Sequence, residues 1–334
     1  MVQKADAAGL VKPRRQGNFF REYSIWIILV ALFILATVIS SGSFIRPSNL
    51  INVLFMGAPI GICAIGETLV ILTAGIDLSV ASIWILAGVV GGSLAKAGFS
   101  PILALVIALI VSLIVGAING WIVAYLQVSP LIATLGTLTA VEGISRILTG
   151  NMPVMSLPSG YRFVGGWSIG PISIQTVLWI LLVIVAVLLM KKTVLGRTIF
   201  ALGGNPIAAK YSGLSVGKGL FAVYCISGLL AGLAGILDSA YLNIATPNVD
   251  MNALFDVIAG CVVGGVSLFG GKGNIINTVA GVLVIVAIEN LLSILGISPL
   301  IFQGVIGIVI VLAVLLNVVF GKDNGSERLR TKGV

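Results

Sequence analysis

The longest stretch of the sequence without a charged residue covers residues 97–141, and it contains PILALVIALIVSLIVGAINGWI at residues 101–122. About 20 apolar residues in a helix are enough to cross the hydrocarbon core of a membrane. The stretch is therefore long enough for two helices, and the turn sequence QVSP at residues 127–130 separates them. We predict membrane-spanning helices near 101–122 and 131–149.

The composition of the whole chain agrees with a membrane protein. Of its 334 residues, 58% are hydrophobic and 9% are charged, and the mean hydropathy is +1.18. A soluble domain carries roughly 25% charged residues, so this chain has too few to cover a water-exposed surface of its size. Disordered chains are poor in apolar residues and rich in charge. A soluble globular enzyme and a disordered protein are both excluded.

The charge-free runs predict an all-α polytopic membrane protein with about ten transmembrane helices. The predicted spans are residues 25–44, 51–73, 79–95, 101–122, 131–149, 172–190, 219–240, 253–269, 275–293 and 300–319. They form a single transmembrane domain at 25–319, between a basic N-terminal segment at 1–24 and a C-terminal tail at 320–334.

The distribution of basic residues predicts the orientation of this domain. Loops on the cytoplasmic side of a membrane carry an excess of Lys and Arg. With ten spans and a cytoplasmic N-terminus, the cytoplasmic segments hold 15 of the 19 basic residues, and only Arg46, Lys96, Arg146 and Arg162 lie outside. We therefore expect both termini in the cytoplasm. The net charge of +8 follows from this topology and from contact with membrane lipid, and it does not indicate a nucleic-acid partner.

The longest predicted cytoplasmic loop, residues 191–218, has an organised sequence. Asn205 is a favourable N-cap, Pro206 suits the first helical position, and Gly213 is a plausible residue to end the helix. These residues predict a short helix at 206–212. Such a helix, projecting into the cytoplasm, is either a docking element for another protein or an ordinary connector.

Three stretches together resemble one family, the permease subunits of bacterial ABC importers for sugars of the ribose, xylose and arabinose type. They are residues 66–80 (GETLVILTAGIDLSV), residues 196–213 (GRTIFALGGNPIAAKYSG) and residues 259–274 (AGCVVGGVSLFGGKGN). The resemblance implies a multi-pass protein of the bacterial inner membrane that translocates a monosaccharide or related polyol. It also implies three kinds of partner, which are an ABC ATPase subunit, a periplasmic sugar-binding protein and a second permease copy in a homodimer or heterodimer.

By the same resemblance, residues 191–218 are the loop that couples the permease to its ATPase. The residues assigned to this coupling are Gly196, Arg197, Gly203, Gly204, Asn205, Ala208, Ala209, Ser212 and Gly213. No P-loop sequence, G-x-x-x-x-G-K-[ST], is present. We therefore expect no cofactor and no catalytic residue in this chain, with ATP and Mg²⁺ bound by the partner. The absence of His and the apolar setting of the three cysteines predict no metal site.

Polar residues inside or near the spans are candidates for the translocation pathway, because they are costly to place there. They are Glu67, Asp77, Ser79, Asn119, Asp256, Glu289 and Asn290. For Asp77, a structural role as the cap of the next helix competes with contact to substrate. Glu142 and Arg146 are four residues apart, which predicts an ion pair on one helix face.

The outer loops at 150–171 and 243–251 are candidates to contact the sugar-binding protein, by their position alone. Two other function classes compete with this interpretation. A proton-coupled secondary sugar carrier acting without an ATPase is the alternative, with Glu67, Asp77 or Glu289 handling the proton. A membrane enzyme is disfavoured, because the sequence has no recognisable pair of nucleophile and base.

Overall fold

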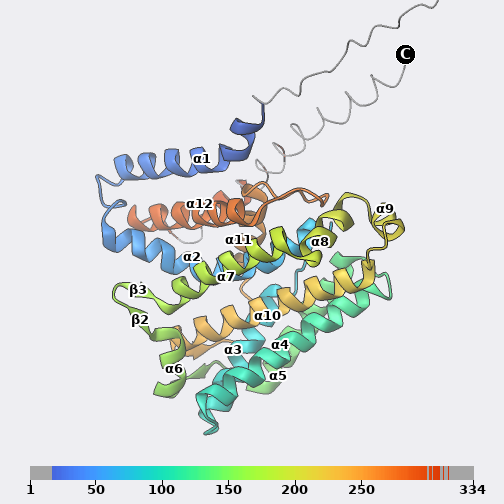
Figure 1. Ribbon diagram of the computed structural model, residues 1–334. Helices are drawn as coiled ribbons and strands as arrows, with labels where there is room; N and C mark the ends of the chain where they lie inside the picture. Colours follow the sequence, from blue (N-terminus) through green and yellow to red (C-terminus); the bar gives the residue numbers. More distant parts are fainter. Residues whose placement is uncertain (1–16, 299–300, 303, 309–310, 312–314, 316–334) are drawn as a thin grey trace, which may run out of the picture.

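The computed structural model describes residues 17–298, 301–302, 304–308, 311 and 315, and this part of the chain is mostly helical (Figure 1). Its long helices lie side by side in a bundle. The helices are α1 (Gly17–Ile39), α2 (Pro47–Leu72), α3 (Val80–Lys96), α4 (Pro101–Ala124), α5 (Pro130–Thr149), α6 (Ser159–Gly166), α7 (Ile174–Lys192), α8 (Val194–Gly204), α9 (Pro206–Tyr211), α10 (Val216–Leu242), α11 (Met251–Val263) and α12 (Ile275–Ile294).

Four two-residue strands pair outside the helices. Strand β1 (Val154–Met155) is antiparallel to β4 (Ile244–Ala245), and β2 (Ser168–Ile169) is antiparallel to β3 (Ile172–Ser173). The first pair joins the two outer loops predicted from the sequence, because each loop contributes one strand.

Six of the described helices are long and apolar enough to cross a membrane: α2, α4, α5, α7, α10 and α12. They agree with six of the ten predicted spans. The predicted spans 25–44, 79–95 and 253–269 correspond to shorter apolar helices. The tenth, 300–319, falls largely outside the described residues, as do most of the segment 1–24 and all of the tail 320–334.

Two differences from the predicted elements have local causes. Helix α11 ends at Val263 rather than at 269, because Gly264 closes the helix and Gly265 takes a positive φ of 83°. The predicted loop 191–218 contains a helix, α8, that the sequence analysis did not anticipate. The Thr193 hydroxyl caps it by accepting a hydrogen bond from the Gly196 N–H at 3.2 Å.

Helix α10 lies at the centre of the bundle and packs against α2, α3 and α4. Glycines allow this close approach. A Cβ atom at Gly116 of α4 would collide with the Tyr224 carbonyl group of α10, and one at Gly228 of α10 would collide with the Ser112 carbonyl oxygen and the Gly116 backbone of α4. Small residues at such contacts let neighbouring helix backbones approach directly.

The two ends of the bundle differ (Figure 1). The beginning of α1 and the helices α8 and α9 lie toward one end, whereas β2, β3 and α6 lie at the opposite end. The predicted coupling loop and the predicted outer loop 150–171 are thus separated by the length of the bundle.

Candidate translocation cavity and coupling surface

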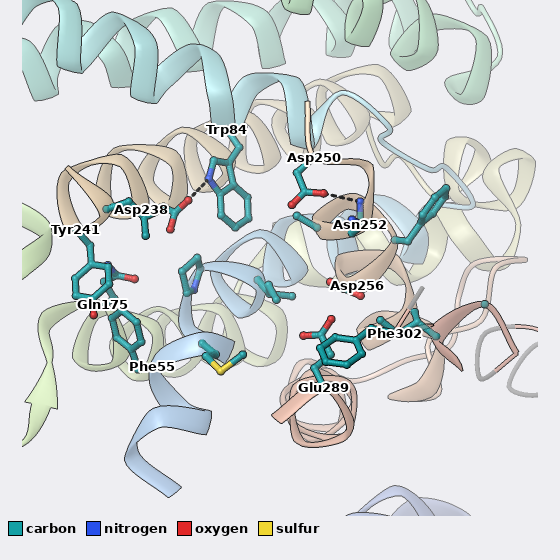
Figure 2. A pocket seen from close by; sticks show the side chains of 18 residues that line it. Phe55, Trp84, Gln175, Asp238, Tyr241, Asp250, Asn252, Asp256, Glu289 and Phe302 are labelled. Carbon is teal, nitrogen blue, oxygen red and sulfur yellow. Dashed lines mark hydrogen bonds between the residues drawn. The ribbon is translucent and has the colours of Figure 1, made fainter. Parts of the chain in front are cut away.

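A cavity of about 700 Å³ lies between α2, α3, α7, α10, α11 and α12. Its volume is in the usual range for a site that holds a small molecule. Figure 2 shows two groups of polar and aromatic side chains facing it. One group contains Phe55, Trp84, Gln175, Asp238 and Tyr241, and the other contains Asp250, Asn252, Asp256, Glu289 and Phe302.

The first group combines aromatic rings with hydrogen-bonding atoms. Trp84 Nε1 donates to Asp238 Oδ2 at 3.3 Å, and the rings of Phe55 and Tyr241 lie 4.4 Å apart. Gln175 is fully buried, and its Nε2 donates to the Leu237 carbonyl oxygen at 3.2 Å. Its Oε1 has no hydrogen-bond partner within the structure. This oxygen is therefore an acceptor in need of a donor.

The second group is acidic. Asp250 caps α11, because its Oδ1 accepts a hydrogen bond from the Asn252 N–H at 2.9 Å. Asp256 is one and a half turns further along α11 and is 4% exposed, and Glu289 extends toward it from α12 (Figure 2). Asp256 Oδ1 has no hydrogen-bond partner within the structure. A ligand with several donor groups would satisfy it.

The cavity brings together only two of the seven predicted pathway residues, Asp256 and Glu289. Asn290 exchanges hydrogen bonds with Asn49 instead, at 2.8 and 3.1 Å, and thereby links α12 to the start of α2. The aromatic residues, Gln175, Asp238, Asp250 and Asn252 were not predicted to line it. The signal available in the sequence was weak, because only Asp238 and Asp250 carry a charge. Asp238 lies near the end of a predicted span, and Asp250 lies in a predicted outer loop.

The other four predicted pathway residues form a separate buried network. Asp77 Oδ1 accepts hydrogen bonds from the Ser79 N–H at 3.0 Å and the Ser79 hydroxyl at 2.6 Å. Its Oδ2 accepts from the Ser227 hydroxyl of α10 at 3.0 Å. Glu67 Oε1 accepts from the Asp77 N–H at 3.1 Å, and Asn119 Nδ2 donates to the Ser79 hydroxyl at 2.7 Å. This network fastens the turn between α2 and α3 to α4 and α10.

The position of Asp77 corrects the expected cap. The residue that precedes α3 is Ser79 rather than Asp77, and the Ser79 side chain makes no capping hydrogen bond. The Asp77 carboxyl group binds the N–H two residues further on and so shapes the turn before the helix. Its hydrogen bonds hold the turn itself and connect it to α10.

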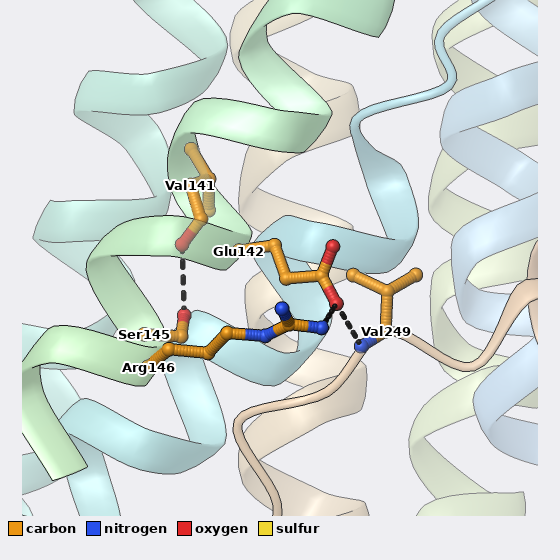
Figure 3. Close-up of polar contacts among 5 residues, drawn as sticks. All are labelled: Val141, Glu142, Ser145, Arg146 and Val249. Atoms are coloured by element: carbon orange, nitrogen blue, oxygen red, sulfur yellow. Dashed lines mark hydrogen bonds and ion pairs between the residues drawn. The ribbon is translucent and has the colours of Figure 1, made fainter. Parts of the chain in front are cut away.

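The predicted pair of Glu142 and Arg146 is confirmed, with 2.7 Å between Arg146 Nη2 and Glu142 Oε1 (Figure 3). The same carboxylate oxygen accepts a hydrogen bond from the Val249 N–H at 3.2 Å. Val249 directly precedes Asp250, which lines the cavity. Glu142 therefore joins α5 to the segment that leads into the acidic side of the cavity.

The coupling-loop residues lie on α8, α9 and the turn that follows. Asn205 Oδ1 accepts a hydrogen bond from the Ala208 N–H at 3.0 Å, with Pro206 at the first helical position, and Gly213 has a φ of 80°. The expected N-cap, first-turn proline and terminating glycine are all confirmed. The Ser212 hydroxyl donates to the Ala208 carbonyl oxygen at 2.9 Å and closes the same turn.

Of the two alanines of α9 that were assigned to coupling, only Ala208 is exposed. Ala209 is 4% exposed and packs inward, whereas Ile207 is 68% exposed and Tyr211 is 87% exposed. Ile207 and Tyr211 are four residues apart and so share a face of the helix. They are the apolar surface residues of this element, and Ala208 is exposed beside them.

Helix α8 contacts the membrane-embedded helices through glycines. A Cβ atom at Gly203 would overlap the Leu72 carbonyl oxygen at the end of α2 and the Gly271 N–H group. The Gly271 N–H itself donates to the Leu72 carbonyl oxygen at 2.9 Å. A Cβ atom at Gly196 would likewise collide with the Met190 backbone, while Arg197 is exposed. All three stretches that carry the family resemblance therefore meet at this junction.

Comparison with known proteins decides the family. A family model described as the permease component of branched-chain amino acid transport systems matches residues 49–314. The chain is 40% identical over 293 residues to the ribose import permease protein RbsC of Bacillus subtilis, covering 86% of this chain and 91% of the relative. The chain belongs to the family of sugar import permeases.

Two further relatives support this membership. The RbsC protein of Escherichia coli K12 is 39% identical over 295 residues, covering 86% of this chain and 92% of that protein. The galactose/methyl galactoside import permease protein MglC of the same strain is 34% identical over 319 residues, covering 90% and 95%. No solved structure matches the chain. As a sugar import permease, it is a multi-pass inner-membrane protein and a transport component.

Proposed function

We propose that this permease moves a monosaccharide through the cavity between α2, α10, α11 and α12. The observation that carries the proposal is the cavity lining, which combines aromatic faces with buried, unpartnered acceptor oxygens at Gln175 and Asp256. Sugar hydroxyls donate hydrogen bonds to such acceptors, and the apolar face of a sugar ring packs against aromatic side chains. The named substrates of relatives, which are ribose, galactose or methyl galactoside, and allose, suggest an aldopentose or aldohexose.

The family membership favours an ATP-driven importer over a proton-coupled carrier. In this proposal a separate ATPase subunit binds ATP and Mg²⁺ and docks on the exposed face of α9, at Ile207, Ala208 and Tyr211. A periplasmic binding protein delivers the sugar at the opposite end, near β2, β3 and α6. A second permease copy completes the pathway.

The proposed orientation places α9 and both termini in the cytoplasm, with ten spans in all. Two observations support it. The beginning of α1 lies toward the same end of the bundle as α8 and α9 (Figure 1). Basic residues are concentrated in the segments that this orientation places inside.

The proposed coupling route runs through backbone contacts. Movement of α8 and α9 would reach the end of α2 at Leu72 and the segment before α12 at Gly271, because Gly203 lies against both. Helix α2 lines the cavity with Phe55, and α12 lines it with Glu289. A movement of α9 would therefore be transmitted to the cavity through a continuous series of packed groups.

Co-purification of the ATPase tests the docking surface. The double variant Ile207→Glu, Tyr211→Glu is expected to lose the ATPase subunit and sugar uptake, because two carboxylates replace the apolar contact. Ile169→Glu is the matched control for retention of the ATPase, since Ile169 is an exposed isoleucine at the opposite end of the bundle. Retention of the ATPase by the double variant, at wild-type levels, would contradict docking on α9.

A further inference from the structure

The Asp, Glu, Lys and Arg residues in the described lining of the cavity are all acidic. Four of the eleven acidic residues of the chain line it: Asp238, Asp250, Asp256 and Glu289. No Lys or Arg occurs in its described lining, although the chain as a whole has a net charge of +8. A ligand inside this cavity therefore meets carboxyl groups and finds no basic side chain.

The helix that begins at the cavity does not supply positive charge either. The N-terminus of a helix favours anions, because its first N–H groups lack partners within the helix. In α11 this position is already occupied by the Asp250 carboxylate, which accepts a hydrogen bond from the Asn252 N–H. The Asp250 carboxylate at the N-terminus of α11 would repel an anionic ligand.

The unpartnered atoms at the cavity are acceptors. Gln175 Oε1 and Asp256 Oδ1 are buried and lack hydrogen-bond partners among the residues that the structure describes. The side-chain nitrogen of Gln175 donates a hydrogen bond to the Leu237 carbonyl oxygen. Both free oxygens require donors, which hydroxyl and ammonium groups supply and which carboxylate and phosphate groups lack when ionised.

We propose that these residues form a charge filter by which the permease itself rejects anions. The filter admits neutral polyhydroxy compounds and cations, and it excludes sugar phosphates, sugar acids and the carboxylate group of an amino acid. Asp256 and Glu289 determine the selection, because they face each other across the acidic side (Figure 2). This charge selection, which rests on the proposed transport role of the cavity, adds a specificity step to that of any binding protein.

Thiol modification measures the filter without any transport. A cysteine is introduced by Ala253→Cys on the cavity wall in a Cys225→Ala background, since Cys63 and Cys261 are buried. Full-length protein in membranes is treated with a cationic or an anionic methanethiosulfonate of similar size. The cationic reagent is expected to react at least about 10-fold faster, after normalisation to Ser168→Cys on exposed β2.

Removal of the carboxylates tests the assignment to residues. Adding Asp256→Asn and Glu289→Gln to Ala253→Cys is expected to bring the rate ratio to within about 2-fold of the Ser168→Cys reference. The same two substitutions should leave the ratio at Ser168→Cys unchanged, which controls for a general change in the protein. Glu289→Gln alone serves if the double variant is poorly inserted, with an intermediate ratio expected.

Two results would overturn the filter. One is equal normalised rates for both reagents at Ala253→Cys when Asp256 and Glu289 are intact. The other is a rate ratio at Ala253→Cys that stays the same after Asp256→Asn and Glu289→Gln are added. Failure of the proposed function is distinguishable, because it would appear as absent sugar uptake by the complete importer with the reagent ratio intact.

Discussion

Two backbone contacts determine what can replace Gly203. Its α-carbon faces the Leu72 carbonyl oxygen and the Gly271 N–H group, and neither backbone group can move without disturbing α2 or the segment before α12. Gly204 is the next residue in the same helix, and a Cβ atom there would meet nothing within 4 Å. Substitution of Gly204 is therefore a matched control for substitution of Gly203.

Gly203→Ala should destabilise the protein and uncouple transport. Overpacking of this kind costs about 1–3 kcal/mol, and the junction between α8 and α2 would open. Gly204→Ala should change the unfolding midpoint and uptake little. Thermal unfolding in detergent, with sugar uptake by the complete importer, makes the comparison. Equal effects of the two substitutions would show that the junction has no special role.

Individual pathway residues were only partly predictable from the sequence. Asp256 and Glu289 stand out because a carboxyl group is rare in an apolar segment. The same rule selected Glu67 and Asp77, which serve a structural network away from the cavity. Trp84, Gln175 and Tyr241 are ordinary residues in helices, and only the tertiary arrangement of distant segments shows that they share a cavity.

The short helix α9 depends on its cap more than a long helix does. Isolated helices of this length are unstable in water, and α9 has six residues. Asn205 satisfies the Ala208 N–H, and Gly213 allows the chain to leave in the left-handed region.

Asn205→Ala is expected to weaken α9 by about 1 kcal/mol, because the N-cap hydrogen bond is lost. ATPase binding should then fall about fivefold. Asn205→Asp is the control, since aspartate is an equally good N-cap. Titration of purified ATPase subunit onto the permease in detergent gives both affinities. A fall in affinity for both variants would assign the effect to the amide group itself instead of to the cap.

Glu142 links two elements, α5 and the segment 243–250, while Arg146 contacts only Glu142 in the interactions shown in Figure 3. Glu142→Ala leaves the Val249 N–H without its acceptor, at a cost of about 1–3 kcal/mol. Arg146→Ala removes a half-exposed pair four residues apart, which contributes about 0.5 kcal/mol.

Hydrogen exchange at the Val249 amide should therefore accelerate in Glu142→Ala and change little in Arg146→Ala. Mass spectrometry of peptides covering residues 243–250 measures this directly. Equal protection in Glu142→Ala and the wild-type protein would mean that the segment is held by other contacts.

Element positions were more predictable than element lengths. Six predicted spans coincide with long apolar helices, because charge-free runs of about 20 residues have few other stable structures in a membrane. Helix α8 was missed because its glycines at 196, 203 and 204 lower helix propensity. Close packing against Met190, Leu72 and Gly271 requires Gly196 and Gly203, and this tertiary requirement outweighs the local preference.

At the scale of the whole molecule, the proposed translocation cavity and the proposed docking surface lie at different depths of one bundle. The cavity lies among α2, α10, α11 and α12, and the surface of α9 lies at one end. Helix α2 connects them, because Phe55 lines the cavity and Leu72 lies against α8. This arrangement suits a subunit that receives mechanical work at one end and opens a cavity further along.

ATP-driven uptake into proteoliposomes tests the central proposal most directly. The permease is reconstituted with its ATPase and binding protein, and radiolabelled D-ribose, D-galactose, D-allose and L-leucine are compared. We expect ATP-dependent uptake of at least one sugar and no uptake of leucine. Ala253→Trp, which fills the cavity, should abolish sugar uptake while the ATPase still co-purifies, and Ile110→Trp on an exposed helix face should not. Uptake that needs a proton gradient instead of ATP, or that continues with the cavity filled, would contradict the account.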